Sequence, residues 1–356
     1  MKMTNREKLQ ALLCDEMDAI LLTGEANRQY ATGAQIAEGM CLITPKRCLY
    51  FTDSRYIESA QNQLSDITVQ EISREQSYTA RIQQAIAEDE IHTIGVEEED
   101  LTHGAFMRLS EKLSAVLVPC QSRINALRQI KEPWEINIMH RAQEIADSVF
   151  SEILLVIREG MTEKELEAEL IYRLYRAGAQ GLSFPPIVVS GPNTSMPHGV
   201  AGNRKIVSGD FITMDFGIKL QGYCSDMTRT VALGHASEKM RRIYDIVLRA
   251  QREAISMTCA GRTGAEIDGI ARNIIADAGY GAYFGHGYGH SLGLEIHESP
   301  NCSPSNPNPI PAGAVISAEP GIYIPGEFGV RIEDVVVVTQ NGCENLTHSS
   351  KELIIL

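Results

Sequence analysis

Two aspartates in one strand-forming stretch constrain this chain more than any other feature. The stretch 211–233 reads FITMDFGIKLQGYCSDMTRTVAL, and β-branched and aromatic residues lie on both sides of its turn-like centre. A hairpin folded between Leu220 and Gln221 places Asp215 opposite Asp226. Two facing carboxylates about 5 Å apart repel each other by roughly 3 kcal/mol at an effective dielectric constant of about 20. The pair therefore indicates a cation between the two strands.

A second stretch repeats this arrangement. It runs from Glu319 to Glu333 and has the turn dipeptide Pro325-Gly326 at its centre. Folded about Gly326, it places Glu319 opposite Glu333. Any one of these carboxylates alone would be interpreted as a solvated strand residue. Acidic pairs at mirror positions of two hairpins instead predict a cluster of four carboxylates, and such a cluster requires two divalent cations.

Composition limits the possible partners and the compartment. The chain has 356 residues, a formal net charge of -14 and a pI near 5.2, which argues against nucleic acid or an anionic membrane as its main partner. We find no apolar run typical of a signal peptide or a membrane span. The eight cysteines include no Cys-x-x-Cys pair and fit reduced thiols. We therefore expect a cytoplasmic protein.

The pattern of the chain changes between residues 125 and 133. Before this point, short strand-like and helix-like segments alternate, which predicts a small α/β domain over residues 1–127. After it, Pro133 suits the first turn of a long helix, and strands dominate from residue 184 onward. We therefore expect a second domain over residues 128–356.

A glycine-rich segment adds an imidazole to the carboxylates. Residues 285–298 read GHGYGHSLGLEIHE, and three of the nine histidines lie in it. The predicted metal ligands are two aspartates, two glutamates and one histidine: Asp215, Asp226, His290, Glu319 and Glu333. Oxygen ligands with one imidazole suit manganese, cobalt, iron or zinc better than calcium. Two such ions can activate a water and polarise a carbonyl.

Four other side chains are candidates for the same site. His297 lies seven residues after His290, so the two would point to opposite faces of a straight strand, or they lie on either side of a bend at Gly293. His198 lies in a loop after an apolar strand. Two further candidates, Arg331 and Tyr323, are either structural partners of the carboxylates or substrate contacts.

Two well-known motifs do not fit. No Gly-x-Gly-x-x-Gly register and no Gly-Lys-Ser/Thr mark a phosphate loop. The Asp-Phe-Gly string at 215–217 lacks the other protein-kinase segments.

Together these residues resemble the M24-type metallopeptidases of the pita-bread fold, in the branch of Xaa-Pro aminopeptidase and Xaa-Pro dipeptidase (prolidase). The match covers about 128–356, and HGYGHSLGLEIHE at 286–298 resembles the proline-peptidase signature, with Tyr288 where the family has an aliphatic residue. The first domain resembles the N-terminal domain of prolidase through FTDSRY at 51–56 and LRQIK at 127–131. Methionine aminopeptidases generally lack that domain.

The resemblance implies an α/β N-terminal domain followed by an α+β pita-bread catalytic domain. It implies two divalent metal ions, most often manganese, with cobalt, zinc or iron as alternatives, and a homodimer. It also implies that His198 and His297 contact substrate or stabilise the tetrahedral intermediate. Glu319 is then the proton acceptor. Arg331 and Tyr323 either support the site or contact the substrate.

The sequence is compatible with several activities. The sequence does not decide between a dipeptidase and an aminopeptidase for longer Xaa-Pro peptides. An aminopeptidase of the same fold with another N-terminal specificity is one alternative, and a non-enzymatic peptide- or protein-binding member is another. A metal-free hydrolase related to creatinase has no need for the four carboxylates.

Overall fold

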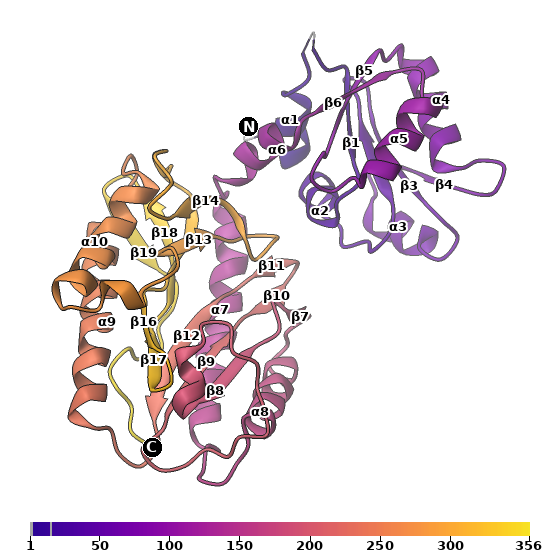
Figure 1. Ribbon diagram of the computed structural model, residues 1–356. Helices are drawn as coiled ribbons and strands as arrows, with labels where there is room; N and C mark the ends of the chain where they lie inside the picture. Colours follow the sequence, from indigo (N-terminus) through magenta and orange to yellow (C-terminus); the bar gives the residue numbers. More distant parts are fainter. Residues whose placement is uncertain (1–2, 15) are drawn as a thin grey trace. The chain divides into compact units, whose positions relative to one another are not determined.

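The chain folds into two units whose boundary in the sequence lies between Arg128 and Gln129. The computed structural model describes residues 3–14 and 16–356 (Figure 1). Within these ranges, no helix combines the length and the apolar character needed to cross a bilayer. Each unit has its own apolar core.

The first unit is an α/β domain built on one six-stranded sheet. The strands are β1 (Ala19–Leu22), β2 (Met40–Ile43), β3 (Cys48–Thr52), β4 (Thr68–Glu71), β5 (Thr93–Val96) and β6 (Val116–Pro119). The helices are α1 (Asn5–Gln10), α2 (Glu25–Thr32), α3 (Ile57–Gln63), α4 (Tyr78–Asp89), α5 (His103–Lys112) and α6 (Gln121–Arg128).

The strand order of this sheet is β4-β3-β2-β1-β5-β6. The β1–β5, β5–β6 and β3–β4 pairs are parallel, and β2 runs antiparallel to both of its neighbours. Apolar residues of α4 and α5 pack on the strand face that carries Ala19 and Leu21. The alternation of strands and helices thus produces the α/β domain predicted from the sequence.

The second unit contains four long helices and thirteen strands among the described residues. The helices are α7 (Pro133–Leu154), α8 (Glu163–Arg176), α9 (Glu238–Met257) and α10 (Gly264–Asp277), with two short 3-10 turns, η1 (Gly191–Ser195) and η2 (Gly281–Tyr283). The first strands are β7 (Gly181–Leu182), β8 (Ile187–Ser190), β9 (Phe211–Phe216), β10 (Ile218–Leu220), β11 (Tyr223–Cys224) and β12 (Met227–Ala232). The others are β13 (Gly289–Ser291), β14 (Glu298–Cys302), β15 (Val315–Ala318), β16 (Gly321–Ile324), β17 (Phe328–Arg331), β18 (Asp334–Thr339) and β19 (Gly342–Asn345).

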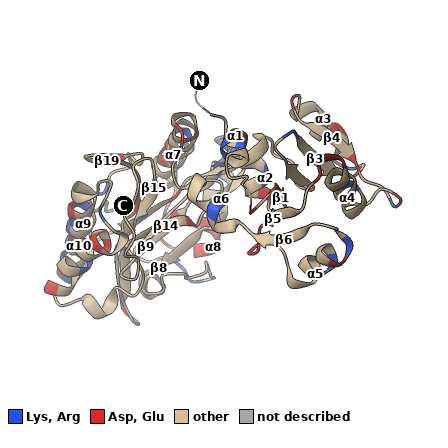
Figure 2. Ribbon diagram, turned by 90° about the horizontal axis from the view of Figure 1, so that it is seen from above, with Lys and Arg blue, Asp and Glu red and all other residues tan. Residues whose placement is uncertain are grey.

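Two pairs of helices cover the sheets of the second unit. Helices α7 and α8 share an apolar core with β8, β9 and β12, which form one three-stranded sheet. Helices α9 and α10 share another with strands of the five-stranded sheet β14-β13-β15-β18-β19. The exposed face of α9 carries charges of both signs (Figure 2). This α+β layering leaves the strand ends between the two helix pairs free to carry polar side chains.

Capping residues define the ends of several helices as the sequence indicates. Thr4 and Glu7 form a capping box at α1, and Thr162 and Glu165 form one at α8. Pro133 occupies the first turn of α7.

The register predicted for the first hairpin is wrong. Asp215 pairs with Thr228, and it does not lie opposite Asp226. The tight turn is centred between Gln221 and Gly222, one residue later than predicted, because both of these residues adopt positive φ angles of 48° and 82°. This conformation belongs to the type I′ turns that match the twist of a hairpin. Shifting the centre by one residue moves each cross-strand partner by two.

The register of the second hairpin agrees with the prediction. Gly321 pairs with Arg331 and Ile324 with Phe328, so the centre of the hairpin is Gly326. Gly326 has a φ of 76°, a conformation that glycine adopts at little cost.

Candidate metal centre

Five acidic and imidazole side chains from separate strands converge in the second unit. They are Asp215 on β9, Asp226 before β12, His290 on β13, Glu319 after β15 and Glu333 before β18. All five line one cavity of about 590 Å³. The aspartates and Glu333 are buried, which is exceptional for carboxylates that have no compensating positive charge.

Three of these residues, Asp226, His290 and Glu333, each have a potential metal-ligating atom, and these three atoms lie within 4.8 Å of one another. The Nε2 atom of His290 lies 3.3 Å from Oε1 of Glu319 and 3.7 Å from Oδ2 of Asp226. The Thr228 hydroxyl donates to Oε2 of Glu333 at 2.6 Å, and the Ser317 hydroxyl donates to Oε1 of Glu319 at 3.0 Å. These hydroxyls hold the two glutamates in place.

The tautomer of His290 follows from its hydrogen bond. Its Nδ1 lies 3.2 Å from the carbonyl oxygen of Ser291, so Nδ1 carries the proton and donates it. Burial lowers the pKa of His290, which keeps the imidazole neutral. The lone pair of Nε2 then faces Asp226 and Glu319, and it is the form that binds a metal ion.

Asp215 is held by a chain of hydrogen bonds that leads away from the cluster. Arg331 donates from Nη2 to Oδ2 of Asp215 at 2.6 Å and from Nη1 to the hydroxyl of Tyr323 at 2.8 Å. Nε2 of His286 lies 2.9 Å from the same hydroxyl. Arg331 also donates from Nε to Oγ1 of Thr228 at 3.0 Å, so the guanidinium holds side chains of both β9 and β12.

The electrostatics of the cluster call for a cation. Burial, followed by the charges of Glu333, Asp215 and Glu319, raises the pKa of Asp226 well above its usual value. Burial and the charges of Glu319 and Asp215 do the same to Glu333. Oδ1 of Asp215 and Oδ1 of Asp226 are buried without a hydrogen-bond partner among the described residues. Unpartnered oxygen atoms and an imidazole lone pair facing one another fit divalent metal ions, so the residues present suit the predicted group.

The two histidines at 290 and 297 lie on either side of a bend. Residues 293–297 follow no regular strand, and the rings of His290 and His297 lie 4.5 Å apart at an angle of 74°. Of the two arrangements left open by the sequence, the bend at Gly293 is the correct one. Burial, followed by the neighbouring His290, lowers the pKa of His297. His198, from the loop after η1, lines the same cavity.

His286 and Tyr323 are two positions at which the residues that line the cavity differ from the predicted site residues. His286 lines the cavity and bonds to Tyr323, although it was not predicted as a site residue. Its spacing of four residues from His290 in a glycine-rich segment was the available signal. Tyr323 itself is not among the residues that line the cavity, whereas Arg331 is.

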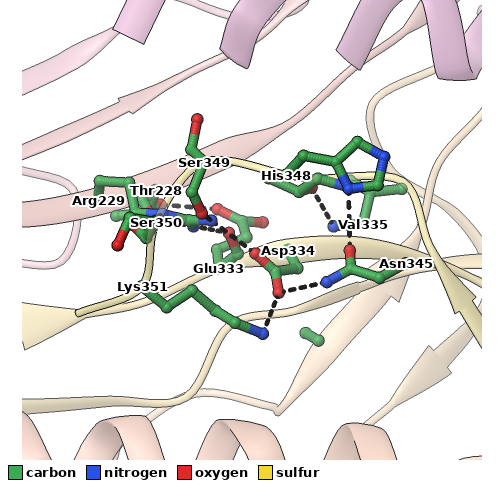
Figure 3. Close-up of polar contacts among 12 residues, drawn as sticks. Thr228, Arg229, Glu333, Asp334, Val335, Asn345, His348, Ser349, Ser350 and Lys351 are labelled. Carbon is green, nitrogen blue, oxygen red and sulfur yellow. Dashed lines mark hydrogen bonds and ion pairs between the residues drawn. The ribbon is translucent and has the colours of Figure 1, made fainter. Parts of the chain in front are cut away.

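A buried ion-pair network lies directly behind Glu333 (Figure 3). The next residue, Asp334, accepts from Arg229 at 2.8 Å, from Lys351 at 2.6 Å and from Asn345 at 2.8 Å. Arg229 also donates to the carbonyl oxygen of Glu333. Although burial opposes it, the positive charges of Arg229 and Lys351 hold the pKa of Asp334 below its usual value. The backbone that carries Glu333 is therefore fixed from behind.

Two protein-family models match this chain, one in each unit. The model of metallopeptidase family M24 matches residues 137–340, and that of the creatinase/prolidase N-terminal domain matches residues 6–130. This chain belongs to metallopeptidase family M24. It is a metal-dependent peptidase, and the resemblance and fold class predicted from the sequence are confirmed.

Three similar proteins illustrate the family. An Xaa-Pro dipeptidase of Pyrococcus horikoshii is 37% identical over 96% of this chain and 95% of its own length. The structure of an Xaa-Pro dipeptidase from Bacillus anthracis has a TM-score of 0.95 and 40% identity over 99% of both chains. That of an X-Pro aminopeptidase from Thermotoga maritima has a TM-score of 0.93 and 36% identity, also over 99% of both chains.

Proposed function

We propose that this M24 peptidase is an exopeptidase that hydrolyses the bond between an N-terminal residue and proline. The observation that carries the proposal is the convergence of four carboxylates and the Nε2 lone pair of His290 in one cavity. The names of the similar proteins supply the substrate class. In this assignment, residues 1–127 are the N-terminal domain and residues 128–356 are the catalytic domain.

The ligands proposed for two divalent ions are the five residues named from the sequence: Asp215, Asp226, His290, Glu319 and Glu333. When bound, such ions polarise the scissile carbonyl and lower the pKa of a water molecule. Manganese suits this oxygen-rich set, and cobalt, zinc and iron are the alternatives. Oδ1 of Asp215 and Oδ1 of Asp226 have no hydrogen-bond partner in the described part of the chain, which supports the proposal that metal completes the contacts of these carboxylates.

The protein's own groups handle the protons of the reaction. Glu319 is the proton acceptor in this proposal, the role that the family resemblance gives it, and its carboxylate lines the cavity 3.3 Å from Nε2 of His290. His297 and His198 line the cavity, and each can donate a hydrogen bond or a proton toward the leaving group. Arg331 lies in the cavity wall, where it can contact the substrate. Tyr323 supports the site indirectly, through the hydrogen bonds of its hydroxyl with Arg331 and His286.

The wall of the cavity suits a proline ring. An Xaa-Pro bond is a tertiary amide without an N–H group, so its site recognises the shape of the ring rather than a donor. Apolar side chains line part of the cavity, among them Phe184, Pro185, Ile187 and Ile296. Both dipeptides and longer peptides contain this ring, and the length of the substrate is an outcome of the experiment below.

We further propose that the protein is a cytoplasmic homodimer. All eight cysteines lie in the described part of the chain and are free thiols, which fits a reducing compartment. The homodimer follows from the family resemblance, and sedimentation equilibrium would test it.

The decisive experiment uses protein stripped of metal by a chelator. Manganese, cobalt, zinc or iron is added back, and an Xaa-Pro dipeptide is compared with an Xaa-Pro tripeptide and with an Ala-Ala dipeptide. Metal-dependent cleavage of the Xaa-Pro dipeptide alone would define a dipeptidase, and cleavage of the tripeptide an aminopeptidase. Glu319→Gln should abolish activity, while the exposed control Glu327→Gln in the same hairpin should not.

Other results would redirect the assignment. Cleavage of Ala-Ala with no preference for proline would indicate an aminopeptidase of different N-terminal specificity. Folded protein that binds two ions and cleaves none of the peptides would refute the peptidase substrate proposed here and favour a binding function. Failure to bind metal would refute the five-ligand assignment.

A further inference from the structure

The segment that carries His297 is held by a buried ion pair outside the cavity. No side chain among the residues that the structure describes forms a hydrogen bond with the His297 ring, which contacts His290 by ring packing alone. The ring therefore has little to orient it except the backbone on which it sits. That backbone, residues 293–297, has no regular secondary structure.

The carboxylate of Glu298 holds this segment in place. Its Oε1 accepts a hydrogen bond from the backbone N–H of Glu295 at 3.1 Å. Its carboxylate also lies so close to Gly293 that a Cβ at that glycine would be 2.8 Å from both oxygen atoms. The carboxylate thus contacts the segment at Gly293 and at Glu295, and a side chain at position 293 would displace it.

Lys131 fixes Glu298 in turn. Its Nζ lies 3.0 Å from Oε2 of Glu298, and the two side chains are only 2% and 5% exposed. The backbone N–H of Lys131 donates to the carbonyl oxygen of Gly313 at 2.9 Å, so the lysine is itself anchored. A buried pair of this kind has a defined geometry because neither charge can turn toward water.

Glu298 begins β14 and its side chain is buried outside the cavity, whereas the adjacent side chain of His297 lines the cavity. We propose that Lys131 and Glu298 are positioning residues that hold the imidazole of His297 toward the metal ligands. This inference rests on the role proposed above for His297.

The test compares Lys131→Met with Lys239→Met, which removes an exposed lysine paired with Glu327 in the same unit. With a displaced imidazole, Lys131→Met should lower kcat on an Xaa-Pro dipeptide by roughly 10- to 100-fold. KM should change by less than about threefold, since His297 acts on the transition state. Lys239→Met should leave both constants unchanged.

A double-mutant cycle separates positioning from a general structural effect. In a His297→Ala background, Lys131→Met should cause little further loss, because its effect passes through the missing ring. If the two losses multiply instead, the ion pair acts independently of His297 and the inference is overturned. Should Lys131→Met fail to fold, Lys131→Met combined with Glu298→Gln removes both charges and enters the same cycle.

A readout without substrate keeps this inference distinct from the proposed function. In zinc-loaded protein with 13C-labelled histidine, the ring signal of His297 should shift or broaden in Lys131→Met and stay unchanged in Lys239→Met. An unchanged signal in Lys131→Met refutes the positioning role. If the parent protein cleaves no Xaa-Pro peptide, the proposed function fails, and the ring signal alone still decides the inference.

Discussion

Asp334→Asn tests how much the ion-pair network behind Glu333 contributes to stability. Asp334 is fully buried, and it accepts hydrogen bonds from Arg229, Lys351 and Asn345 (Figure 3). An asparagine keeps the shape of the side chain and removes its charge. Whichever way the new amide is turned, its NH2 group faces donors: Lys351 and Asn345 on one side, or Arg229 on the other.

These contacts determine how much free energy of unfolding is lost in Asp334→Asn. The Arg229 side chain is 1% exposed, so its positive charge stays buried after the substitution. Two hydrogen bonds to a charged group, from Arg229 and Lys351, are weakened or lost, and such bonds contribute about 1.5–3 kcal/mol each. Breaking a buried ion pair from one side costs about 3–5 kcal/mol. We therefore expect Asp334→Asn to lower the free energy of unfolding by about 4 kcal/mol.

The single tryptophan provides the assay. Trp134 lies on α7 of the second unit, so its fluorescence during urea unfolding reports that unit and not the first. Chelator keeps the protein free of metal, because metal binding would add to the measured stability. Glu352→Gln is the control, since it breaks the exposed pair with Arg252 and should cost no more than about 1 kcal/mol. A loss below about 1 kcal/mol for Asp334→Asn would refute the reasoning.

Three further predictions concern the surroundings of the ligands. Tyr288→Phe should raise the free energy of unfolding by about 1 kcal/mol in the same urea assay, because the Tyr288 hydroxyl is fully buried and has no hydrogen-bond partner among the described residues; a destabilised variant would contradict this. Gly289→Ala should reduce the metal bound per chain, measured by elemental analysis, since its Cβ would lie 2.0 Å from the carbonyl oxygen of Ser317 and displace His290; full metal content would disprove the steric argument. Removing the metal should lower the melting temperature by several degrees, because the carboxylates then repel one another without compensation; an unchanged scanning-calorimetry trace would count against a metal at this site.

Local chemistry made much of the fold predictable. The capping residues of α1 and α8 and the proline at the start of α7 specify helix starts through contacts within one turn, and the helix start predicted at Pro133 is observed. The second hairpin was predicted with its correct centre, because Pro325-Gly326 is a turn signal that depends on no distant residue.

The first hairpin shows where such reasoning fails. Its turn places Gln221 in a left-handed conformation that residue type alone does not indicate. Asp215 and Asp226 were nevertheless identified as a pair, although the reason given, direct opposition across the hairpin, was wrong. What brings them to one cavity is the convergence of β9 and β12 with strands far away in the sequence.

Individual contacts between distant residues were harder to predict. The sequence suggested Arg331 as a partner of the carboxylates but not that it pairs with Asp215, and it did not suggest that Lys131 meets Glu298. Both pairs are separated by more than a hundred residues, and only the packed fold brings them together.

The order in which the chain is made gives the ligand arrangement a further consequence. The five proposed ligands are spread from Asp215 to Glu333, and Lys351, which supports the backbone of Glu333 through Asp334, follows later still in the chain. During synthesis the site is therefore incomplete until Glu333 and Lys351 have emerged from the ribosome. The ion cannot guide early folding as it does in a zinc finger, whose ligands are close in sequence. The metal acquired is then determined by the ions available to a finished, folded protein, and expression in a different medium can yield the same polypeptide with a different metal.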